Sequence, residues 1–314
     1  MAFNWQTFKT RTLTAAVFVA VMLTGLLWNK WSFLVLFSII HFGCWWEYFR
    51  LMEKIHNITF HKYIKLGFML TGFAIMLWFC GTAYEINNYS LKNNFSFLVS
   101  IAGVVLLVIG VFQSKKIKLK LFSVIALGLI YISLSLALII DLRTGRLLLP
   151  NDILVRFRSG IISSDEFLKT SLFETKGFYI CLIVIFTMWI NDTMAYIIGS
   201  LFGKTPLSKV SPKKTVEGTI GGIILSSVII GFTAKYFIDD LFVKDLSLFV
   251  WIGLGLAAAI VGVLGDLLES KLKRMANVKD SGHIMPGHGG FLDRFDSMLL
   301  AIPAVWLFVY FFMR

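Results

Sequence analysis

Nine long apolar stretches, separated by short polar connections, dominate the pattern of hydrophobic and polar positions along the chain. A membrane-spanning helix needs about 20 mainly apolar residues, and in lipid every backbone N–H and C=O must be paired within the chain. Runs of this length therefore predict helices. The predicted spans are residues 12–29, 31–49, 65–84, 95–113, 121–141, 177–199, 217–235, 247–268 and 298–313. The first two spans are nearly fused, and the last is short.

The composition indicates that lipid, rather than water, is the solvent of this chain. Of its 314 residues, 57% are hydrophobic and 15% are charged, and the mean hydropathy is +0.79. A soluble domain carries about 25% charged residues. We therefore expect an all-α polytopic membrane protein, a bundle of about nine transmembrane helices. Cys44, Cys80 and Cys181 lie in apolar runs without metal-ligand spacing, so we expect buried, free thiols.

Basic residues give the expected orientation and the expected partners. With a cytoplasmic N-terminus, 19 of the 30 Lys and Arg residues fall inside, and six of the remaining 11 lie in one long segment, 142–176. Long loops count little in the positive-inside rule, so the N-terminus is expected in the cytoplasm. The net charge of +12 on so apolar a chain favours anionic lipid head groups and phosphorylated substrates, and no nucleic acid.

Three regions are predicted: N-terminal transmembrane helices over 1–141, an extracytoplasmic loop over 142–176 with one amphipathic turn or helix, and a C-terminal catalytic transmembrane region over 177–314. The first apolar run ends without a small-residue cleavage site, which predicts a retained helix rather than a signal peptide. The chain shows no N-terminal soluble extension, so the expected location is the inner (plasma) membrane of a bacterium, with the active site facing the cytoplasm.

Acidic side chains next to a glycine-rich segment make residues 265–297 the first candidate site. Asp266 ends an apolar span, where a carboxylate is costly unless it is paired or binds a cation. Asp293 and Asp296 would share one face if their segment is helical. Hard cations such as Mg²⁺ take oxygen ligands from carboxylates and substrate phosphates. The three aspartates therefore predict a metal site, and the alternative is ion pairing with nearby Lys and Arg residues.

The glycine-rich segment Pro286–Gly290 is too flexible for a helix interior. Gly289 and Gly290 would let backbone N–H groups approach an anion closely. His288 is a candidate phosphate hydrogen-bond donor or proton carrier. Zinc binding by His283 and His288 is disfavoured, because no cysteine or further histidine lies near them in the sequence.

A second polar constellation lies at residues 189–222. Asn191 and Asp192 interrupt an apolar run, so they should face the bundle interior or a water-filled cavity. Ser211 followed by Pro212 predicts a helix N-cap. The N-terminal N–H groups of that helix, together with Lys213 and Lys214, would form a phosphate-binding corner, with Glu217 nearby. The alternative is that these lysines only follow the positive-inside rule.

These residues resemble the phosphatidate cytidylyltransferases. The family's C-terminal pattern is Ser-x-x-Lys-Arg, then Lys-Asp, then Pro-Gly-His-Gly-Gly, then Asp-Arg-x-Asp. This chain has it at Ser270–Arg274, Lys279–Asp280, Pro286–Gly290 and Asp293–Asp296. The segment Ser211–Gly218 is also similar to the family. The match covers about residues 189–297, whereas the first 175 residues resemble the family only as a set of apolar helices.

The resemblance implies an enzyme of phospholipid biosynthesis, in which a phosphatidate oxygen attacks the α-phosphate of CTP and pyrophosphate leaves. It implies Mg²⁺ and leaves open a second ion, Mg²⁺ or K⁺, and a homodimer. Asp266 and Asp293 would be the principal metal ligands, with Asp296 adjacent. The upstream polar segment contributes Asp192, Ser211, Lys213, Lys214 and Glu217. The candidate phosphate contacts are Lys273, Arg274, Lys279 and Arg294.

Two alternative functions remain at this point. A related membrane enzyme could use the same site with another lipid phosphate or a polyprenol-type acceptor. A transporter or channel for anions or lipids would also explain nine spans with acids inside them. A transporter places its binding residues near the membrane midplane, however, and here the polar residues are expected at one face.

Overall fold

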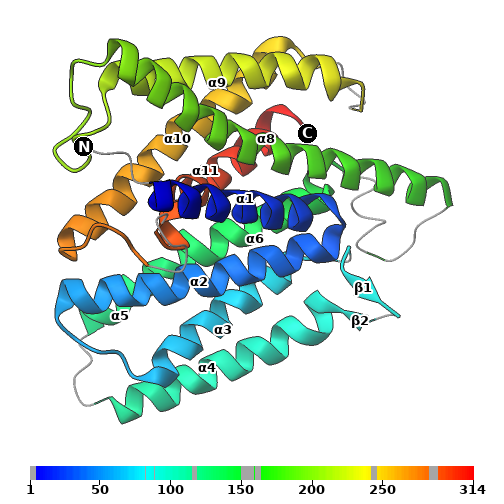
Figure 1. Ribbon diagram of the computed structural model, residues 1–314. Coiled ribbons are helices and arrows are strands. Elements are labelled where there is room, and N and C mark those ends of the chain that lie inside the picture. Colours follow the sequence, from blue (N-terminus) through cyan, green and yellow to red (C-terminus); the bar gives the residue numbers. More distant parts are fainter. Residues whose placement is uncertain are drawn as a thin grey trace. The chain divides into compact units, whose positions relative to one another are not determined.

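The structure, a computed structural model, describes residues 5–81, 83–87, 89–114, 119–149, 159, 164–241, 246–282 and 289–314 (Figure 1). The chain divides into two compact units. The first unit consists of Met1–Trp78, Tyr84–Leu136 and Glu269–Asp296, and the second consists of Phe79–Ala83, Ala137–Leu268 and Ser297–Arg314. Two C-terminal helices contribute residues to both units.

The first unit is built from helices and one short hairpin. Its main elements are α1 (Trp5–Leu27), α2 (Lys30–His56), α3 (Lys62–Phe79), β1 (Glu85–Ile86), β2 (Tyr89–Ser90), the π-helical turn η1 (Leu91–Phe95), α4 (Ser96–Gln113), α5 (Leu119–Gly128) and the π-helical turn η2 (Leu129–Leu134). The two strands pair antiparallel, with Glu85 opposite Ser90 and Ile86 opposite Tyr89.

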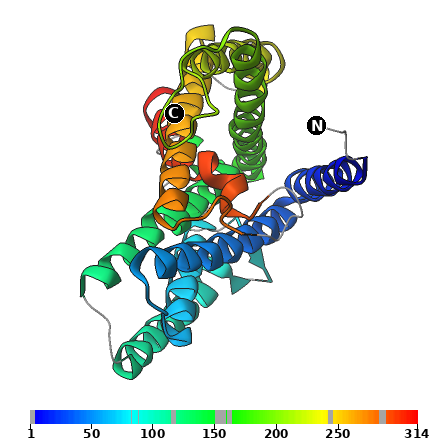
Figure 2. The same cartoon turned by 60° about the vertical axis from the view of Figure 1, so that its left-hand side comes forward.

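The second unit is helical throughout its described part. Its elements are α6 (Ser135–Thr144), η3 (Arg146–Leu148), α8 (Ser164–Phe202), α9 (Val216–Phe237), η4 (Asp239–Leu241), α10 (Leu248–Met275) and α11 (Leu292–Phe312). The last residues of α10 and the first of α11 belong to the first unit. Helices α8 and α9 lie side by side (Figures 1 and 2).

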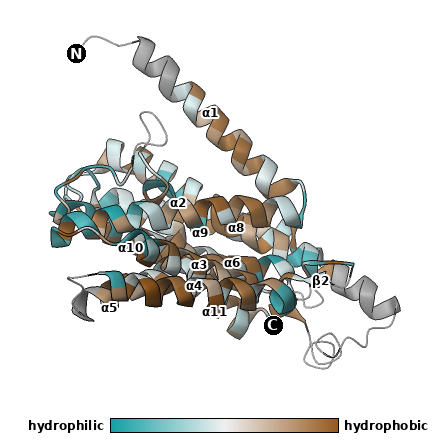
Figure 3. Cartoon of the chain, turned by 90° about the horizontal axis from the view of Figure 1, so that it is seen from below, coloured by the Kyte–Doolittle hydropathy of each residue, from teal (hydrophilic) through white to brown (hydrophobic). Residues whose placement is uncertain are grey.

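The expected fold class is confirmed. Among the described residues, eight helices are long and apolar enough to cross a membrane, and Thr12–Leu27 forms a shorter apolar helix. Hydrophobic residues predominate along α4, whereas polar residues gather mainly at helix ends and connections (Figure 3). The three cysteines are free and buried, as expected. The cytoplasmic position of the N-terminus stays a prediction.

Local signals explain the two helix boundaries that the sequence left soft. The side chain of Asn29 accepts a hydrogen bond from the Ser32 N–H at 2.9 Å, and the Asn29 N–H donates to Ser32 Oγ at 3.1 Å. This capping box separates α1 from α2. At the other end of the chain, α11 begins at Leu292 rather than near residue 298, so Asp293 and Asp296 lie in its first turns.

The non-helical part of segment 142–176, which the sequence predicted as one long loop, is shorter than expected. Residues 164–176 are helical and continue without interruption into the span, forming the single helix α8 of 39 residues. Residues 150–158 and 160–163 lie outside the described part. Sequence reasoning placed the start of the helix too late because Lys176 and the acids before it interrupt the apolar run.

A buried aromatic cluster forms the core of the first unit. Trp45 is fully buried and its indole N–H donates to Ser133 Oγ at 2.9 Å, while His41 Nε2 lies 3.0 Å from the same oxygen. Gly72 faces Ser133, and a Cβ there would overlap its hydroxyl. Ser133 lies in the π-helical turn η2, so this cluster ties α2 and α3 to that turn.

Two buried carboxylates, Asp141 of α6 and Asp239 of η4, hold elements of the second unit together. Asp141 accepts a hydrogen bond from the Trp306 indole at 2.9 Å and pairs with Arg146. Asp239 accepts from the Trp251 indole at 2.8 Å and from the Lys235 ammonium at 2.7 Å. Both acids are thereby neutralised inside an apolar environment, where an unpaired carboxylate would be very costly.

We predict that Asp239→Ala destabilises the protein by about 3 kcal/mol, because it removes the buried carboxylate that accepts from the half-buried Lys235 ammonium and from the buried Trp251 N–H. The measurement is thermal unfolding of the purified protein in detergent, followed by size-exclusion chromatography. Asp240→Ala is the matched control, since the neighbouring Asp240 is exposed and should tolerate the change. Equal unfolding temperatures for the two variants would contradict the anchoring role of Asp239.

Candidate active site

The second unit contains a cavity that brings several predicted residues together. Its volume is about 540 Å³, within the usual range for small-molecule sites. The walls come from α8, α9, α10 and the connection before α9. The lining residues are Asn191, Asp192, Ala195, Tyr196, Gly199, Ser200, Lys213, Lys214, Thr215, Thr219, Val263 and Asp266. Asp192, Lys213, Lys214 and Asp266, predicted from two separate constellations, therefore share one cavity.

Glycines allow α8 and α9 to form one wall of this cavity by close backbone contact. A Cβ at Gly218 would lie 2.6 Å from the Ala195 carbonyl and 2.8 Å from the Gly199 Cα. A Cβ at Gly222 would lie 2.9 Å from the Asn191 carbonyl. Small residues at a helix interface let backbones approach in just this way within membranes. The glycines of this region therefore set the packing of the helices that carry Asn191 and Asp192.

The connection between α8 and α9 is an ordered turn rather than the start of a helix. The Val216 N–H donates to the Thr205 carbonyl at 2.9 Å, and the Leu207 N–H donates to the Lys214 carbonyl at 2.7 Å. A tight turn closes at its tip, where the Lys214 N–H donates to the Ser211 carbonyl at 3.2 Å. This folding back directs Lys213 and Lys214 to the cavity.

The expected N-cap at Ser211 is wrong. Helix α9 begins at Val216, and its N-cap is Thr215, whose side chain accepts from the Gly218 N–H at 3.2 Å. Proline at the second position of a turn is as favourable as proline at a helix start, and here the turn forms. Ser211 is half-buried at the start of that turn and does not line the cavity.

Glu217 orders the same connection. Its carboxylate accepts hydrogen bonds from the Lys204 and Thr205 backbone N–H groups, each at 3.2 Å. The residue lies in the first turn of α9, where a negative charge also complements the helix dipole. Its observed contacts are with the protein's own backbone, and a contact with substrate stays a prediction.

An ion pair inside the cavity joins the two predicted constellations. The Lys214 ammonium lies 2.6 Å from Asp266 Oδ2, with both side chains partly exposed. Lys213 is exposed at the same cavity. The cavity therefore offers one cation already balanced by a carboxylate and one available to a ligand. An anionic ligand would meet Lys213 first and compete with Asp266 for Lys214.

The cavity also offers oxygen atoms that suit a hard cation. Asn191 is buried, and its Oδ1 has no hydrogen-bond partner among the described residues. It shares the cavity with the carboxylates of Asp192 and Asp266 and the hydroxyl of Thr219. Carbonyl, carboxylate and hydroxyl oxygens are the ligands that Mg²⁺ prefers. A buried amide oxygen without a donor is costly, and a bound cation or water would satisfy it.

The first unit holds the second acidic group, at the end of α10 and the start of α11. The Lys273 ammonium lies 2.5 Å from Glu269 Oε2 and 2.6 Å from Asp293 Oδ1. Glu269 is fully buried and Asp293 is largely buried. One lysine thus bridges two carboxylates, so Lys273, predicted as a phosphate contact, is engaged with acids in this structure.

The other oxygen of Asp293 is also occupied. Asp293 Oδ2 accepts from the backbone N–H groups of Ser281 and Gly290, both at 2.8 Å, and from the Ser281 hydroxyl at 2.9 Å. Gly289 has a φ of 85°, a left-handed conformation that favours glycine, and a Cβ there would lie close to the Asp293 carboxylate. A cation at Asp293 would have to displace Lys273 from Oδ1.

Besides Glu269, sequence reasoning missed another acid of this group, Glu47 of α2. It is 1% exposed and accepts hydrogen bonds from the Ser281 hydroxyl at 2.7 Å, the Phe291 N–H at 2.9 Å and the Leu292 N–H at 2.8 Å. The available signal was a single acid in the apolar run 31–49, where a carboxylate requires partners.

The remaining predicted residues divide into exposed and buried groups. Arg274, Lys279 and Arg294 are exposed, whereas Asp296 is 7% exposed and Gly290 is buried. His288, like His283, lies outside the described residues. Among the residues that are described, no three His, Cys, Asp or Glu side chains form a group that could hold a metal ion. The gathering of Asp266, Asp293 and Asp296 around a metal stays a prediction.

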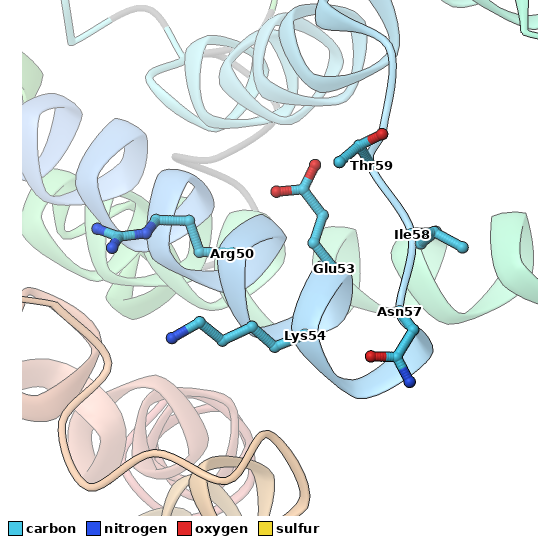
Figure 4. A pocket seen from close by; sticks show the side chains of 6 residues that line it. All are labelled: Arg50, Glu53, Lys54, Asn57, Ile58 and Thr59. Carbon is cyan, nitrogen blue, oxygen red and sulfur yellow. The ribbon is translucent and has the colours of Figure 1, made fainter.

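A second cavity, of about 680 Å³, lies in the first unit at the end of α2. Its lining residues are Arg50, Glu53, Lys54, Asn57, Ile58 and Thr59. Figure 4 shows Arg50 and Lys54 extending to the same side of α2. Glu53 instead pairs with Lys65 at 2.7 Å and accepts from the Phe60 N–H at 2.8 Å. The two cations that are not engaged by Glu53 make this cavity basic.

Comparison with known proteins finds relatives that are similar to part of this chain. A phosphatidate cytidylyltransferase of Staphylococcus aureus (strain COL) is 42% identical over 131 residues, which is 41% of this chain and 48% of that protein. One of Aquifex aeolicus (strain VF5) is 44% identical over 130 residues, 41% of this chain and 46% of that protein. A phosphatidate cytidylyltransferase of Staphylococcus saprophyticus is 44% identical over 135 residues, which is 42% of this chain and 50% of that protein. The matches span about half the length of these relatives.

A match to a protein family covers far more of the chain than these relatives do. Residues 9–312 match the family described as "Cytidylyltransferase family", and this range includes the residues of the second-unit cavity and of the acidic group in the first unit. The chain therefore belongs to the cytidylyltransferase family.

Proposed function

We propose that this multi-pass membrane protein is a metal-dependent CTP:phosphatidate cytidylyltransferase, which forms CDP-diacylglycerol and pyrophosphate at the cytoplasmic face of a bacterial inner membrane. The family membership supports nucleotidyl transfer, and the names of the relatives support phosphatidate as the acceptor. The observation that carries the proposal is the cavity in which Lys213 and the Lys214–Asp266 ion pair lie beside Asp192 and Asn191.

The reaction suits a site of this composition. A phosphatidate oxygen attacks the α-phosphate of CTP, the P–O bond to the β-phosphate breaks, and pyrophosphate leaves with that bond's electrons. Such transfers depend on positioning and charge neutralisation more than on a protein nucleophile. The lipid phosphate is itself the nucleophile, which agrees with the absence of an exposed thiol among the described cysteines.

The lysines would serve the substrate phosphates. Lys213 is exposed at the cavity and would contact a phosphate directly, while Lys214 would turn from Asp266 to a second phosphate oxygen. Asp266, Asp192 and the amide oxygen of Asn191 would then hold one Mg²⁺. Asp293, with Asp296 adjacent, would hold a second ion in place of the Lys273 ammonium that now contacts Asp293 Oδ1. The bound ion would supply positive charge for the triphosphate and for the charge that develops on the leaving pyrophosphate.

The lipid substrate requires access from the bilayer. Tyr196 lines the cavity and is 77% exposed, on the same helix as the exposed apolar residues Ile197 and Leu201. The cavity therefore adjoins a surface that suits acyl chains. This arrangement supports lateral entry of the lipid with its head group in the cavity.

The first prediction is the activity itself. Protein purified in detergent should convert CTP and phosphatidate to CDP-diacylglycerol, with one pyrophosphate per product, only when Mg²⁺ is present. Mass spectrometry of the lipid and an enzymatic pyrophosphate assay measure the two products. Polyprenyl phosphate serves as the competing acceptor, and preferential turnover of that lipid would reject phosphatidate as the substrate.

A second prediction concerns Lys213. Lys213→Ala should raise the KM for CTP about tenfold with a smaller effect on kcat, because one charge-assisted contact to a substrate phosphate is lost. Lys209→Ala is the matched control, since Lys209 is an exposed lysine of the same connection that does not line the cavity. Unchanged kinetics in the Lys213 variant, or an equal change in both, would argue against a phosphate contact.

A third prediction concerns Asp293. Asp293→Asn should abolish turnover, with a loss of at least about a hundredfold, because the amide removes a charge and places an N–H₂ group against existing donors. Expression and the size-exclusion profile should stay normal. Asp240→Asn, a change at an exposed acid, is the control. Near-normal turnover by the Asp293 variant would contradict a catalytic role for this carboxylate.

A further inference from the structure

We propose that Glu47 is a positioning residue, which fixes the backbone on both sides of the glycine-rich segment and, through Ser281, the orientation of the Asp293 carboxylate. The effect on turnover rests on the proposed function. The effect on the structure of Ser281, Gly282 and residues 289–292 does not.

The contacts of Glu47 reach both ends of this segment. On one side, the Ser281 hydroxyl donates to Glu47 Oε2 at 2.7 Å. On the other side, the N–H groups of Phe291 and Leu292 donate to Oε1 at 2.9 Å and Oε2 at 2.8 Å. The two N–H groups belong to the start of α11, where backbone donors lack partners within the helix. A side chain of α2 thus completes the N-terminus of α11 from inside the apolar core.

Two glycines mark how closely the backbone encloses this carboxylate. A Cβ at Gly282 would overlap Glu47 Oε1, and a Cβ at Gly290 would overlap both carboxylate oxygens. One turn earlier on α2, Gly43 also allows close packing, because a Cβ there would overlap the Phe291 ring. The backbone at Gly282 and at Gly290 is therefore fitted to a carboxylate at this position, and any larger residue at either glycine would expel it.

Ser281 links Glu47 to Asp293. Its hydroxyl lies 2.7 Å from Glu47 Oε2 and 2.9 Å from Asp293 Oδ2, and its N–H donates to the same Asp293 oxygen. One hydroxyl proton serves two carboxylates, so the position of one acid depends on the other. Gly290, which contacts Asp293 through its N–H, is itself held against Glu47. Asp293 therefore receives its geometry from two groups that Glu47 holds.

The route from Glu47 through Ser281 and Gly290 to Asp293 predicts how a substitution at Glu47 changes the kinetics. Glu47→Gln keeps the size of the side chain but presents an N–H₂ group to donors, so it should lower kcat about tenfold or more. It should also raise the Mg²⁺ concentration for half-maximal activity at least about threefold, because Asp293 is displaced. The KM for CTP should change less than about twofold, since the proposed phosphate contacts lie elsewhere. A fraction of unfolded protein would lower the rate without shifting the Mg²⁺ dependence.

Two further variants test the route and the background. Ser281→Ala removes only the hydroxyl link and leaves both backbone contacts of Glu47, so it remains informative if Glu47→Gln folds poorly. In the double variant, the losses in kcat should not multiply, because both substitutions interrupt one route. Glu53→Gln is the control on the same helix, whose carboxylate contacts Lys65 and the Phe60 N–H instead.

Hydrogen–deuterium exchange supplies a measurement that needs no turnover. In Glu47→Gln, the amides of Phe291 and Leu292 should exchange at least about tenfold faster than in the wild type, and Glu53→Gln should leave them unchanged. Unaltered exchange would overturn the proposal. Faster exchange with unchanged kcat and Mg²⁺ dependence, or losses that multiply in the double variant, would overturn it as well. A wild-type protein without CDP-diacylglycerol activity would reject the proposed function, and the exchange result would then decide the positioning role alone.

Discussion

A carboxylate within an apolar environment is stable only when cations or hydrogen-bond donors meet its oxygens, and this constraint shapes the buried acidic groups of the described structure. Asp141 and Asp239 each receive an indole N–H and a basic side chain. Asp293 receives Lys273 and three further donors, whereas Glu47 receives backbone and hydroxyl donors. Acids that anchor the fold and acids of the candidate site obey the same rule with different partners.

The choice of partner separates the two roles. At Asp239 the donors are a buried indole and a half-buried ammonium of the protein itself, so the group is complete without a ligand. At Asp266 the partner is Lys214, a partly exposed lysine at a cavity. A ligand that brings both phosphates and a divalent ion can replace this one ion pair by two, because the phosphates attract the lysine while the ion attracts the carboxylate. Lys214 and Asp266 would therefore each keep an oppositely charged partner when such a ligand binds.

The sequence predicted the fold and half of the site because those features depend on local patterns. Span length and apolar runs located the long helices of the described residues. Acids within or at the end of apolar runs singled out Asp192 and Asp266, and the Ser-Pro-Lys-Lys segment singled out Lys213 and Lys214, which the structure places at the same cavity. The cap at Ser211 failed because proline suits both a turn and a helix start, and only the pairing of Thr205 with Val216 decides between them. Glu47 was missed because its partners lie 234 to 245 residues away in the sequence.

Helices α8 and α9 touch through glycine backbones, and this contact limits how the cavity of the second unit can change its width. Where main chains lie against each other without side chains between them, neither helix can slide or rotate without collision. That wall is consequently stiff. Any widening has to come from the turn that carries Lys213 or from the α10 side at Val263. A ligand larger than the present cavity would be accommodated on those sides, while α8 and α9 keep their positions.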